Sequence, residues 1–303
     1  MAEFLSIGIA AMNEEESIER TVRNLTSTYA WTKQPDNEKE LIICINGSTD
    51  NTNKVCAELS KQIPQLRVII QPRADKNAAI NHIARATNPR TQNIYFSDAD
   101  VLVRRTTIDR VISALESNPN AEFAAPRIKN SAAFIPKNKR GVTSQLGVEV
   151  MRLVQQYEYD FFCAMGFAVR KSFLLANPLP IGKNLGDDVF IQAKYRSKII
   201  FVRNAEVIFR QATSFRDQVK QRTRLMTQKR LLFSEYPQLL AKKKANAKKH
   251  PVPTKTIVTS LSPKAKVGAV INQAAEIIAR VRSQKPKKVV WTKVSSTKIG
   301  HRK

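Results

Sequence analysis

The stretch Asn-Ile-Tyr-Phe-Ser-Asp-Ala-Asp-Val-Leu-Val, residues 93–103, is the starting point for both the fold and the site. An apolar strand pattern at 94–96 runs into two carboxylates, Asp98 and Asp100, and a second apolar run follows. Two acids at the end of a buried strand are costly unless positive charge lies beside them. A divalent metal carrying a phosphate-rich ligand would supply that charge, because Mg²⁺ and Mn²⁺ prefer oxygen ligands. An ordinary turn capped by Asp98 explains the pair equally well.

Three similar units precede this stretch. Residues 4–10, 41–45 and 66–70 are short apolar runs, and each is followed by polar turn residues and then by an amphipathic helix pattern. With the strand at 94–96 and the helix pattern after it, the first 117 residues alternate strand and helix four times. This alternation predicts a mostly parallel sheet with helices on both faces.

Polar side chains follow each of these strands. They are Asn13 and Glu14, then Asn46, then Asp75, Lys76 and Asn77, and finally Asp98 and Asp100. In open α/β sheets, ligands bind at the carboxyl ends of the strands. Helix capping would also place polar residues there, but capping does not require two carboxylates on one strand and a lysine near the next. Neither a dinucleotide-binding glycine fingerprint nor a P-loop is present.

The alternation loosens beyond residue 120. The predicted elements are a strand at 122–126, a helix at 141–156, a strand-like run at 160–170, a helix that opens at 184–188, two short strands at 199–202 and 206–209, and a basic helix at 215–233. The helix at 184–188 begins with an acidic pair, Asp187 and Asp188, whose simplest role is to cap the helix and complement its dipole.

The charge is concentrated in the last fifth of the chain. Residues 241–303 hold 17 Lys and Arg against one acid, Glu276, so this segment carries +16 of the net +26. Such a tail predicts an anionic partner, which could be nucleic acid, anionic lipid or another polyanion. We expect residues 237–303 to be a partly disordered basic tail with one helix at 263–282.

The helix expected in the tail is amphipathic. Its apolar stripe consists of Val267, Val270, Ile271, Ala274, Ile278 and Val281. Two interpretations are open: the stripe packs on the preceding domain, or it lies on a membrane surface beside anionic headgroups.

The three cysteines, Cys44, Cys56 and Cys163, form neither an even disulfide framework nor a metal-binding pair, which fits a reducing cytoplasm. A signal peptide pattern and a long apolar span are both absent, so we expect a cytoplasmic protein, or one peripheral to the inner face of a membrane.

Six motifs, taken in order over residues 4–233, resemble those of the family-2 glycosyltransferases, inverting enzymes of the GT-A fold. They are Ile-Ala-Ala-Met-Asn-Glu-Glu-Glu-Ser at 9–17, Ile-Asn-Gly-Ser-Thr-Asp-Asn-Thr at 45–52, Asp-Lys-Asn-Ala-Ala-Ile-Asn at 75–81, Asp-Ala-Asp at 98–100, Gly-Asp-Asp at 186–188 and Gln-Arg-Thr-Arg-Leu at 221–225. The resemblance implies an α/β fold with a mostly parallel, mixed sheet. The catalytic domain would cover 1–236, with a donor half at about 1–117 and an acceptor half at about 118–236.

The resemblance also implies roles for individual residues. Asp100, with Asp98, would hold Mn²⁺ or Mg²⁺ on the donor diphosphate, and Asp188 would be the catalytic base, with Asp187 as the next candidate. The implied donor-binding set is Ala11, Asn13, Glu14, Asn46, Lys76, Asp98, Gln221, Arg222 and Arg224. Asn46 stands where the family commonly has an Asp that contacts the base.

The resemblance therefore implies metal-assisted transfer of a sugar, with inversion, from a nucleoside-diphosphate sugar to an acceptor hydroxyl in polysaccharide or glycolipid biosynthesis. UDP is the favoured carrier. Leu225 replaces the family's Trp in the last motif, and transmembrane helices are absent, so a non-processive enzyme is expected. The alternatives are a nucleic-acid- or polyanion-binding protein that uses the basic tail, and a nucleotidyltransferase on a related sheet.

Overall fold

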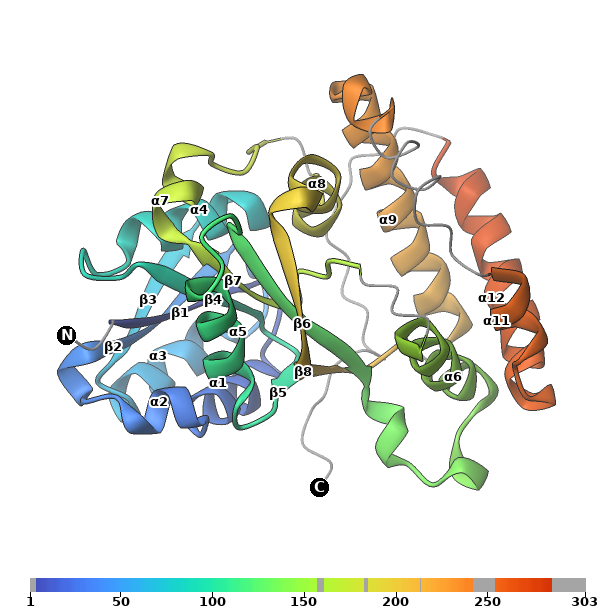
Figure 1. The fold of residues 1–303 in the computed structure, drawn as a ribbon, viewed down its shortest axis with the longest axis horizontal. Helices are drawn as coiled ribbons and strands as arrows, with labels where there is room; N and C mark the ends of the chain where they lie inside the picture. Colours follow the sequence, from blue (N-terminus) through green and yellow to red (C-terminus); the bar gives the residue numbers. More distant parts are fainter. Residues whose placement is uncertain (1–3, 157–160, 183–184, 213, 242–253, 285–303) are drawn as a thin grey trace.

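The computed structural model describes residues 4–156, 161–182, 185–212, 214–241 and 254–284 (Figure 1). Its strands form one eight-stranded mixed sheet in the order β3-β2-β1-β4-β7-β6-β8-β5. The strand bounds are β1 Leu5–Ala11, β2 Lys39–Asn46, β3 Leu66–Gln71, β4 Asn93–Asp98, β5 Leu102–Val103, β6 Phe123–Asn130, β7 Gly166–Arg170 and β8 Ile199–Phe209.

The first four predicted strands pair in parallel, as expected, and β6 and β8 form a further parallel pair. β1 pairs in parallel with β2 on one side and with β4 on the other, and β3 extends the sheet beyond β2. β7 then pairs antiparallel with both β4 and β6, which makes the sheet mixed. The predicted α/β fold with a mostly parallel, mixed sheet is confirmed.

Helices cover both faces of the sheet. Their bounds are α1 Ile18–Thr26, α2 Tyr29–Lys33, α3 Thr52–Gln62, α4 Lys76–Ala86, α5 Thr107–Glu116, α6 Val142–Gln156, α7 Lys171–Ala176, α8 Asp187–Tyr195, α9 Phe215–Glu235, α11 Thr254–Thr259 and α12 Pro263–Arg282. Short 3₁₀ segments are η1 Asp36–Glu38, η2 Ser131–Phe134, η3 Lys137–Lys139 and η4 Arg196–Lys198. None of the helices in these ranges is both long and apolar enough to cross a bilayer.

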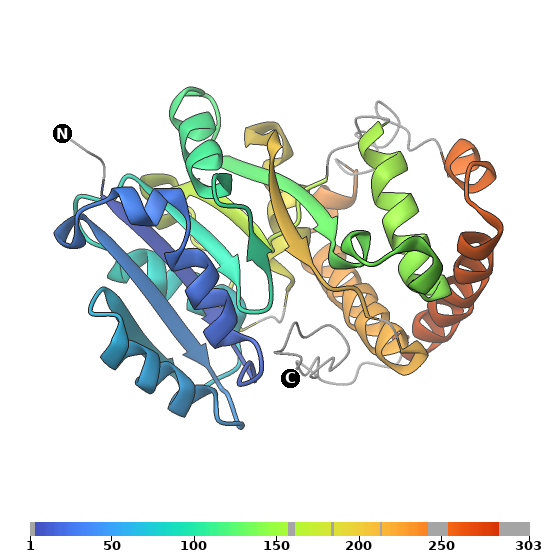
Figure 2. The ribbon, with the colours of Figure 1, turned by 90° about the horizontal axis from the view of Figure 1, so that it is seen from below.

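The strand side chains alternate between two hydrophobic layers. On β2, Leu41 and Ile43 pack with α1, α2, α3 and α5, whereas Ile42 and Cys44 pack with α4 and residues of α7 and α8. β4 follows the same rule, because Tyr95 joins the first layer and Phe96 the second. Figure 2 shows α1, α2 and α3 covering one face of the sheet. Both faces of the central strands are therefore buried, as their continuous apolar sequences require.

One prediction about the strands was wrong. Residues 199–202 and 206–209 were expected as two strands, but they form a single strand, β8. The pairing with β6 shifts register between Pro126 and Arg127, so that Val202 and then Glu206 face consecutive residues of β6. The extra residues between them stay extended but lie outside the ladder, which is a bulge. Their polar sequence suggested a turn.

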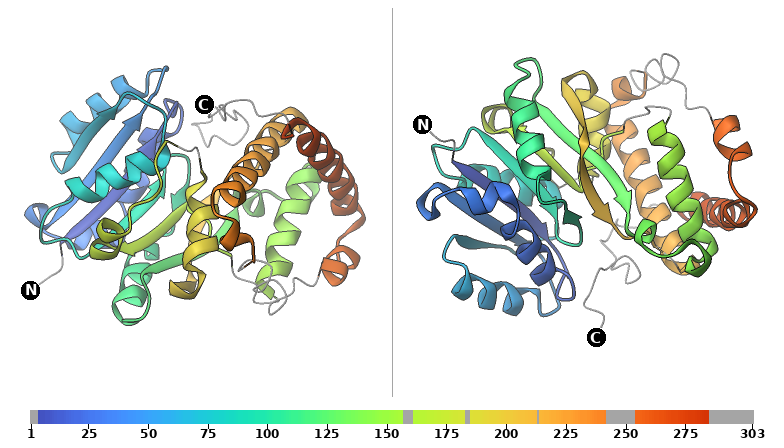
Figure 3. Two further views of the ribbon diagram at one scale, coloured as in Figure 1. Left: turned by 90° about the horizontal axis from the view of Figure 1, so that it is seen from above. Right: turned by 60° about the horizontal axis from the view of Figure 1, so that its bottom comes forward.

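The tail helix was expected at 263–282, and α12 occupies Pro263–Arg282. It begins at Ser262, whose hydroxyl accepts from the amide of Ala265 at 3.3 Å. α12 packs on α6 and α9, and these helices lie together at the end of the molecule remote from β3 (Figures 1 and 3). Partial disorder was expected over residues 237–303, and of these, residues 242–253 and 285–303 lie outside the described residues.

α12 packs by a different face from the predicted stripe. Its fully buried residues are small ones, Ala265, Ala275 and Ala279, while Val267 and Val270 are more than half exposed. Small side chains let the backbone of α12 approach α6 closely. At Gly268 a Cβ atom would lie 2.4 Å from the carbonyl oxygen of Val142.

Gly268→Ala tests this close approach. In an open helix, Gly→Ala stabilises a protein by about 1 kcal/mol, but here the added methyl group must push α12 away from α6. We expect a loss of about 1–3 kcal/mol in the free energy of unfolding, measured with urea. Gly141→Ala is the control, because a Cβ there would have no neighbour within 4 Å. Increased stability in Gly268→Ala would contradict the packing.

Candidate active site

The carboxyl ends of β1, β2 and β4 meet at one edge of the sheet. In the strand register Ala10 lies beside both Cys44 and Asp98, so Ala11, Asn46 and Asp98 end these neighbouring strands together. The parallel pairing brings the polar residues that follow these strands to one edge of the sheet, as predicted. Asp98 begins the cluster, and its backbone amide donates to the carbonyl of Met165 at 2.9 Å, which fixes the end of β4.

Helix α1 holds the segment that carries Asp100. The hydroxyl of Thr21 lies 2.9 Å from the carbonyl oxygen of Ala99 and 3.1 Å from that of Val101. Further along, the amide side chain of Asn24 pairs with both the N–H and the carbonyl of Val103. Ala99 and Val101 are buried in the core, so the partly exposed Asp100 between them is held at the surface of the cluster.

Lys76 joins two acids that are distant in the sequence. Its Nζ lies 2.6 Å from Oδ1 of Asp98, at the end of β4, and 2.9 Å from Oδ2 of Asp187, at the start of α8. All three side chains are largely buried. Burial alone would lower the pKa of Lys76, but Asp187 and Asp98 outweigh it and raise the pKa well above its ordinary value. Lys76 therefore stays charged and ties the two halves of the chain together.

The start of α4 also positions the loop before the acidic pair. Asn77 donates to the carbonyls of Pro180 and Leu185, at 2.9 and 3.1 Å. One turn later, Asn81 donates to the carbonyl of Leu179 and accepts from its amide. These buried amide side chains fix the approach to Asp187 and Asp188. Sequence reasoning missed this role, although polar residues at i and i+4 on an otherwise apolar helix face were a signal.

A second cation comes from α9. Arg224 interacts electrostatically with Asp188, Asp98, Asp100 and Asp187. Gln221, one turn earlier, lies on the same side of the helix by its spacing, as does the buried Gln228 one turn later. A Cβ atom on Gly186 would lie 3.0 Å from the side-chain oxygen of Gln228, so α9 packs directly on the residues that open α8. Gln228 was not predicted as a site residue.

The structure separates Arg222 from the other predicted donor-binding residues. Arg222 is two positions from Arg224, about 200° around the helix, and so faces away from the acids. Its guanidinium pairs with Glu276 at 3.3 Å and donates to Asn272, both on α12. The i, i+2 spacing within 221–225 already implied that only one of the two arginines faces the acids.

Burial, and then the crowding of negative charge, raise the pKa values of two of the acids, Asp98 and Asp188. Burial raises the pKa of Asp98 to about 6; Lys76 opposes this rise, and the charges of Asp187 and Asp100 add to it. Burial also raises the pKa of Asp188, with Asp187 as the next cause, while Lys76 and Arg224 oppose the rise. Four carboxylates and two cations leave a formal charge of −2 at this edge of the sheet.

The residual charge of −2 would be balanced by a divalent metal, so the next question is whether the residues present can bind one. Within the described residues, no three His, Cys, Asp or Glu side chains converge into a metal site made by the protein alone. Mg²⁺ and Mn²⁺ bound with a diphosphate need only one or two carboxylates, because phosphate oxygens and water complete the shell. Asp98 and Asp100 supply such oxygens at the partly exposed side of the cluster, so these residues fit the ion.

The predicted residues after β1 and β2 hold one another in place. Asn13, in a left-handed conformation with φ of 57°, accepts from the amide of Thr49 at 2.8 Å. The amide of Glu14 donates to the hydroxyl of Thr52 at 2.7 Å. Asn46 donates to the carbonyl of Ala11 at 2.9 Å, a bond that an Asp at this position could not make. These bonds lock the two loops into one wall beside the cluster.

Gly47 allows the third loop to close on this wall. Its φ is +71°, and a Cβ atom would lie 2.7 Å from the amide nitrogen of Ala74. A side chain at this position would therefore strain the backbone and push away the loop that leads to Lys76.

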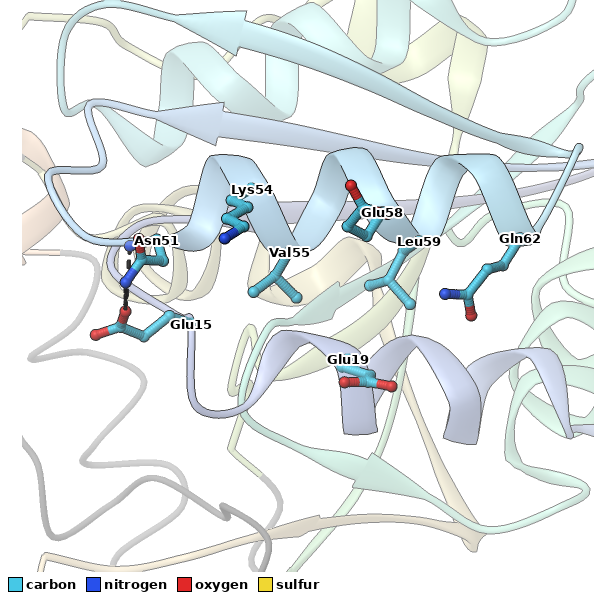
Figure 4. A pocket seen from close by; sticks show the side chains of 8 residues that line it. All are labelled: Glu15, Glu19, Asn51, Lys54, Val55, Glu58, Leu59 and Gln62. Carbon is cyan, nitrogen blue, oxygen red and sulfur yellow. Dashed lines mark hydrogen bonds between the residues drawn. The ribbon is translucent and has the colours of Figure 1, made fainter.

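A groove of about 510 Å³ lies between α1 and α3, outside the cluster (Figure 4). It is lined by Glu15, Glu19, Asn51, Lys54, Val55, Glu58, Leu59 and Gln62. Glu15 closes one end by accepting from Asn51 at 2.9 Å. The acids of the cluster do not reach this groove, which separates two surface helices.

Comparison with known families places the chain in a class. The family model "Glycosyl transferase family 2" matches residues 6–176, more than half of the chain. The chain therefore belongs to glycosyl transferase family 2.

The individual relatives are more distant. A beta-monoglucosyldiacylglycerol synthase of Nostoc sp. is 32% identical over 101 residues, which is 32% of this chain and 21% of the relative. The chain thus spans about a fifth of that relative's length.

Among solved structures, the mannosyltransferase PcManGT from Pyrobaculum calidifontis, in complex with GDP-Man and Mn²⁺, has a TM-score of 0.60 at 15% identity and covers 94% of this chain and 88% of that one. TarS of S. aureus, residues 1–349, has a TM-score of 0.50 at 14% identity, with 91% and 80% covered. At these identities the similarity concerns the fold.

Lys76→Met tests the charge balance of the cluster. Without the ammonium group, Asp98 and Asp187 remain buried with less compensation, which costs about 3–5 kcal/mol of unfolding free energy. Carboxylates with a raised pKa in the folded state lose stabilisation as pH rises through that pKa. The deficit relative to wild type should therefore be larger at pH 8 than at pH 5 in urea unfolding.

Lys61→Met is the matched control, because Lys61 is 71% exposed and pairs with Glu58 on the surface. We expect its unfolding free energy to change by less than about 0.5 kcal/mol at either pH. A Lys76→Met deficit that is equal at pH 5 and pH 8 would contradict the proposed charge balance.

Proposed function

We propose that this protein transfers a sugar from a nucleoside-diphosphate sugar to an acceptor hydroxyl, with inversion and with the assistance of a divalent metal. The observation that carries the proposal is the buried cluster in which Asp98 and Asp100, from the end of β4, meet Asp187 and Asp188, from the start of α8. Acids from two separate parts of the fold suit the two needs of this reaction, which are to hold the leaving diphosphate and to accept a proton.

Asp188 is the proposed base. Inversion requires a carboxylate that takes the proton of the acceptor hydroxyl as the oxygen attacks the anomeric carbon from the side opposite the leaving group. Asp187 is bound to Lys76, whereas Oδ1 of Asp188 accepts the adjacent backbone amide of Val189 at 2.7 Å. The raised pKa of Asp188 makes it a stronger proton acceptor than an exposed Asp. This comparison supports Asp188 over Asp187.

Lys76 and Arg224 are the proposed cationic contacts for the leaving diphosphate. Negative charge develops on the departing phosphate oxygens, and fixed cations in a site of low dielectric constant stabilise it without reorganising. Asp100, with Asp98, would hold the metal, which when bound supplies further charge to the diphosphate. Lys76 is bound to Asp98 in the structure, so Asp98 would serve both the lysine and the metal.

The donor base would lie against the wall formed by Ala11, Asn13, Glu14 and Asn46, and we propose UDP as the carrier. The acceptor we propose is a lipid hydroxyl, in a single non-processive transfer. The support is the similarity to a beta-monoglucosyldiacylglycerol synthase, whose named product is a glycolipid. The three cysteines are free thiols, which fits a cytoplasmic location.

Asp188→Asn tests the assignment of the base. The amide keeps the size of the side chain but cannot accept a proton, so we expect turnover to fall by about 10²–10⁴-fold, measured as release of UDP with Mn²⁺ and acceptor. Nucleotide affinity should be retained, because the diphosphate contacts are untouched. Asp36→Asn is the control, because the side chain of Asp36 is 80% exposed. Wild-type turnover in Asp188→Asn would refute the assignment.

Asp100→Ala tests the metal site without relying on turnover. In the wild type, Mn²⁺ and UDP together should raise the melting temperature more than either alone, and EDTA should remove the gain. Asp100→Ala should lose this cooperative shift. A cooperative shift of wild-type size in Asp100→Ala would rule out Asp100 as a ligand. The same assay with GDP and CDP in place of UDP tests the choice of base.

A further inference from the structure

The outer face of α12 presents a stripe of branched apolar side chains to solvent. Val267, Val270, Ile277 and Val281 are 53%, 67%, 59% and 62% exposed. They are spaced by three, seven and four residues, which places them along one side of the helix. Exposed Ala274 fills the gap between Val270 and Ile277. These five residues, the outer stripe of α12, form a continuous apolar surface about four turns long.

The stripe is not needed to hold α12 on the protein. The contacts with α6 and α9 are made by the opposite side of the helix, where Ala265, Gly268, Ala275 and Ala279 are buried. Val267 and Val270 therefore lie on the side of the helix that faces away from α6 and α9, and they do not belong to the core. Contiguous apolar surface of this kind usually marks a place where a partner binds.

Positive charge borders the stripe on both sides. At about 100° per residue, Lys264 and Arg282 lie along one edge, and Lys266 and Arg280 along the other. All four are exposed. The single acid of the helix, Glu276, already pairs with Arg222 at 3.3 Å and with Arg280 at 3.5 Å. An apolar strip between two rows of cations matches the surface of a bilayer, with acyl chains below anionic headgroups.

We propose that the outer stripe of α12 binds the surface of an anionic lipid bilayer, with the helix axis in the plane of the membrane. The phosphates of a nucleic acid could pair with the four cations, Lys264, Lys266, Arg280 and Arg282. A phosphate backbone has no apolar surface that could cover the valine and isoleucine side chains between them. α12 is already ordered by its packing on α6 and α9, so binding does not require the helix to fold. The proposal does not depend on the transferase activity.

Docking through α12 would also orient the active site. Arg222 and Arg230 of α9 hold α12 through Glu276, Asn272 and the carbonyl of Ser283. Arg224, on the same helix α9, faces the acidic cluster. A membrane that binds α12 therefore sets the distance and the tilt of the cluster relative to the lipid surface.

The test is sedimentation of the full chain with vesicles at physiological ionic strength. We expect binding to vesicles of equimolar phosphatidylcholine and phosphatidylglycerol, and little binding to phosphatidylcholine alone. Val270→Glu combined with Ile277→Glu should weaken binding by at least roughly tenfold, because the stripe then carries two charges. Both side chains are exposed, so the melting temperature should match the wild type.

The control is Ile70→Glu combined with Ile181→Glu. These residues are 69% and 61% exposed and lie outside α12, so they impose the same change in net charge elsewhere. The control should bind vesicles like the wild type. Equal loss in both double variants would show that charge alone drives binding and would overturn the proposal, as would no binding to anionic vesicles. Val270→Glu/Ile277→Glu could instead keep vesicle binding but lose binding to polyuridylate or lose a dimer. That result would assign the stripe to RNA or to a second copy of the chain and would overturn the proposal.

Discussion

The contact of one ammonium group with two carboxylates is the interaction on which the site depends. Lys76 begins α4 in the first half of the chain, Asp98 ends the neighbouring strand β4, and Asp187 begins α8 about ninety residues later. Each of these charges would be costly alone in a buried place. Together they define where the second half of the chain must lie against the first.

The rest of the edge is built around this contact by hydrogen bonds to backbone. Thr21 and Asn24 of α1 fix the segment with Asp100, and Asn77 and Asn81 of α4 fix the loop that leads to Asp187. Amide and hydroxyl side chains suit this task, because they satisfy loop carbonyls without adding charge. The acids are therefore crowded together among backbone segments that hydrogen bonds hold in place.

The sequence was sufficient where a property is local or follows from strand alternation. The apolar runs ending in Asp98 and Asn46 predicted a parallel sheet and the edge at which the polar side chains gather, and the Ser262-Pro263 start predicted α12. The sequence was insufficient where packing decides which of two similar faces of a helix is buried. Arg222 and Arg224 look alike in the sequence, but α12 covers one of them. The apolar stripe of the helix could pack on the domain or lie on a membrane, and the packed face turned out to be a different one, made of alanine and glycine, which allow closer contact.

The most direct test of this account is a double-mutant cycle between Lys76 and Asp187, measured by urea unfolding at pH 8 with Lys76→Met, Asp187→Asn and the double variant. If the two side chains compensate each other in the buried cluster, the cost of Lys76→Met falls sharply once Asp187 is neutral. We predict a coupling free energy of at least about 2 kcal/mol. Single costs that add within about 0.5 kcal/mol would contradict the claim that this contact organises the site.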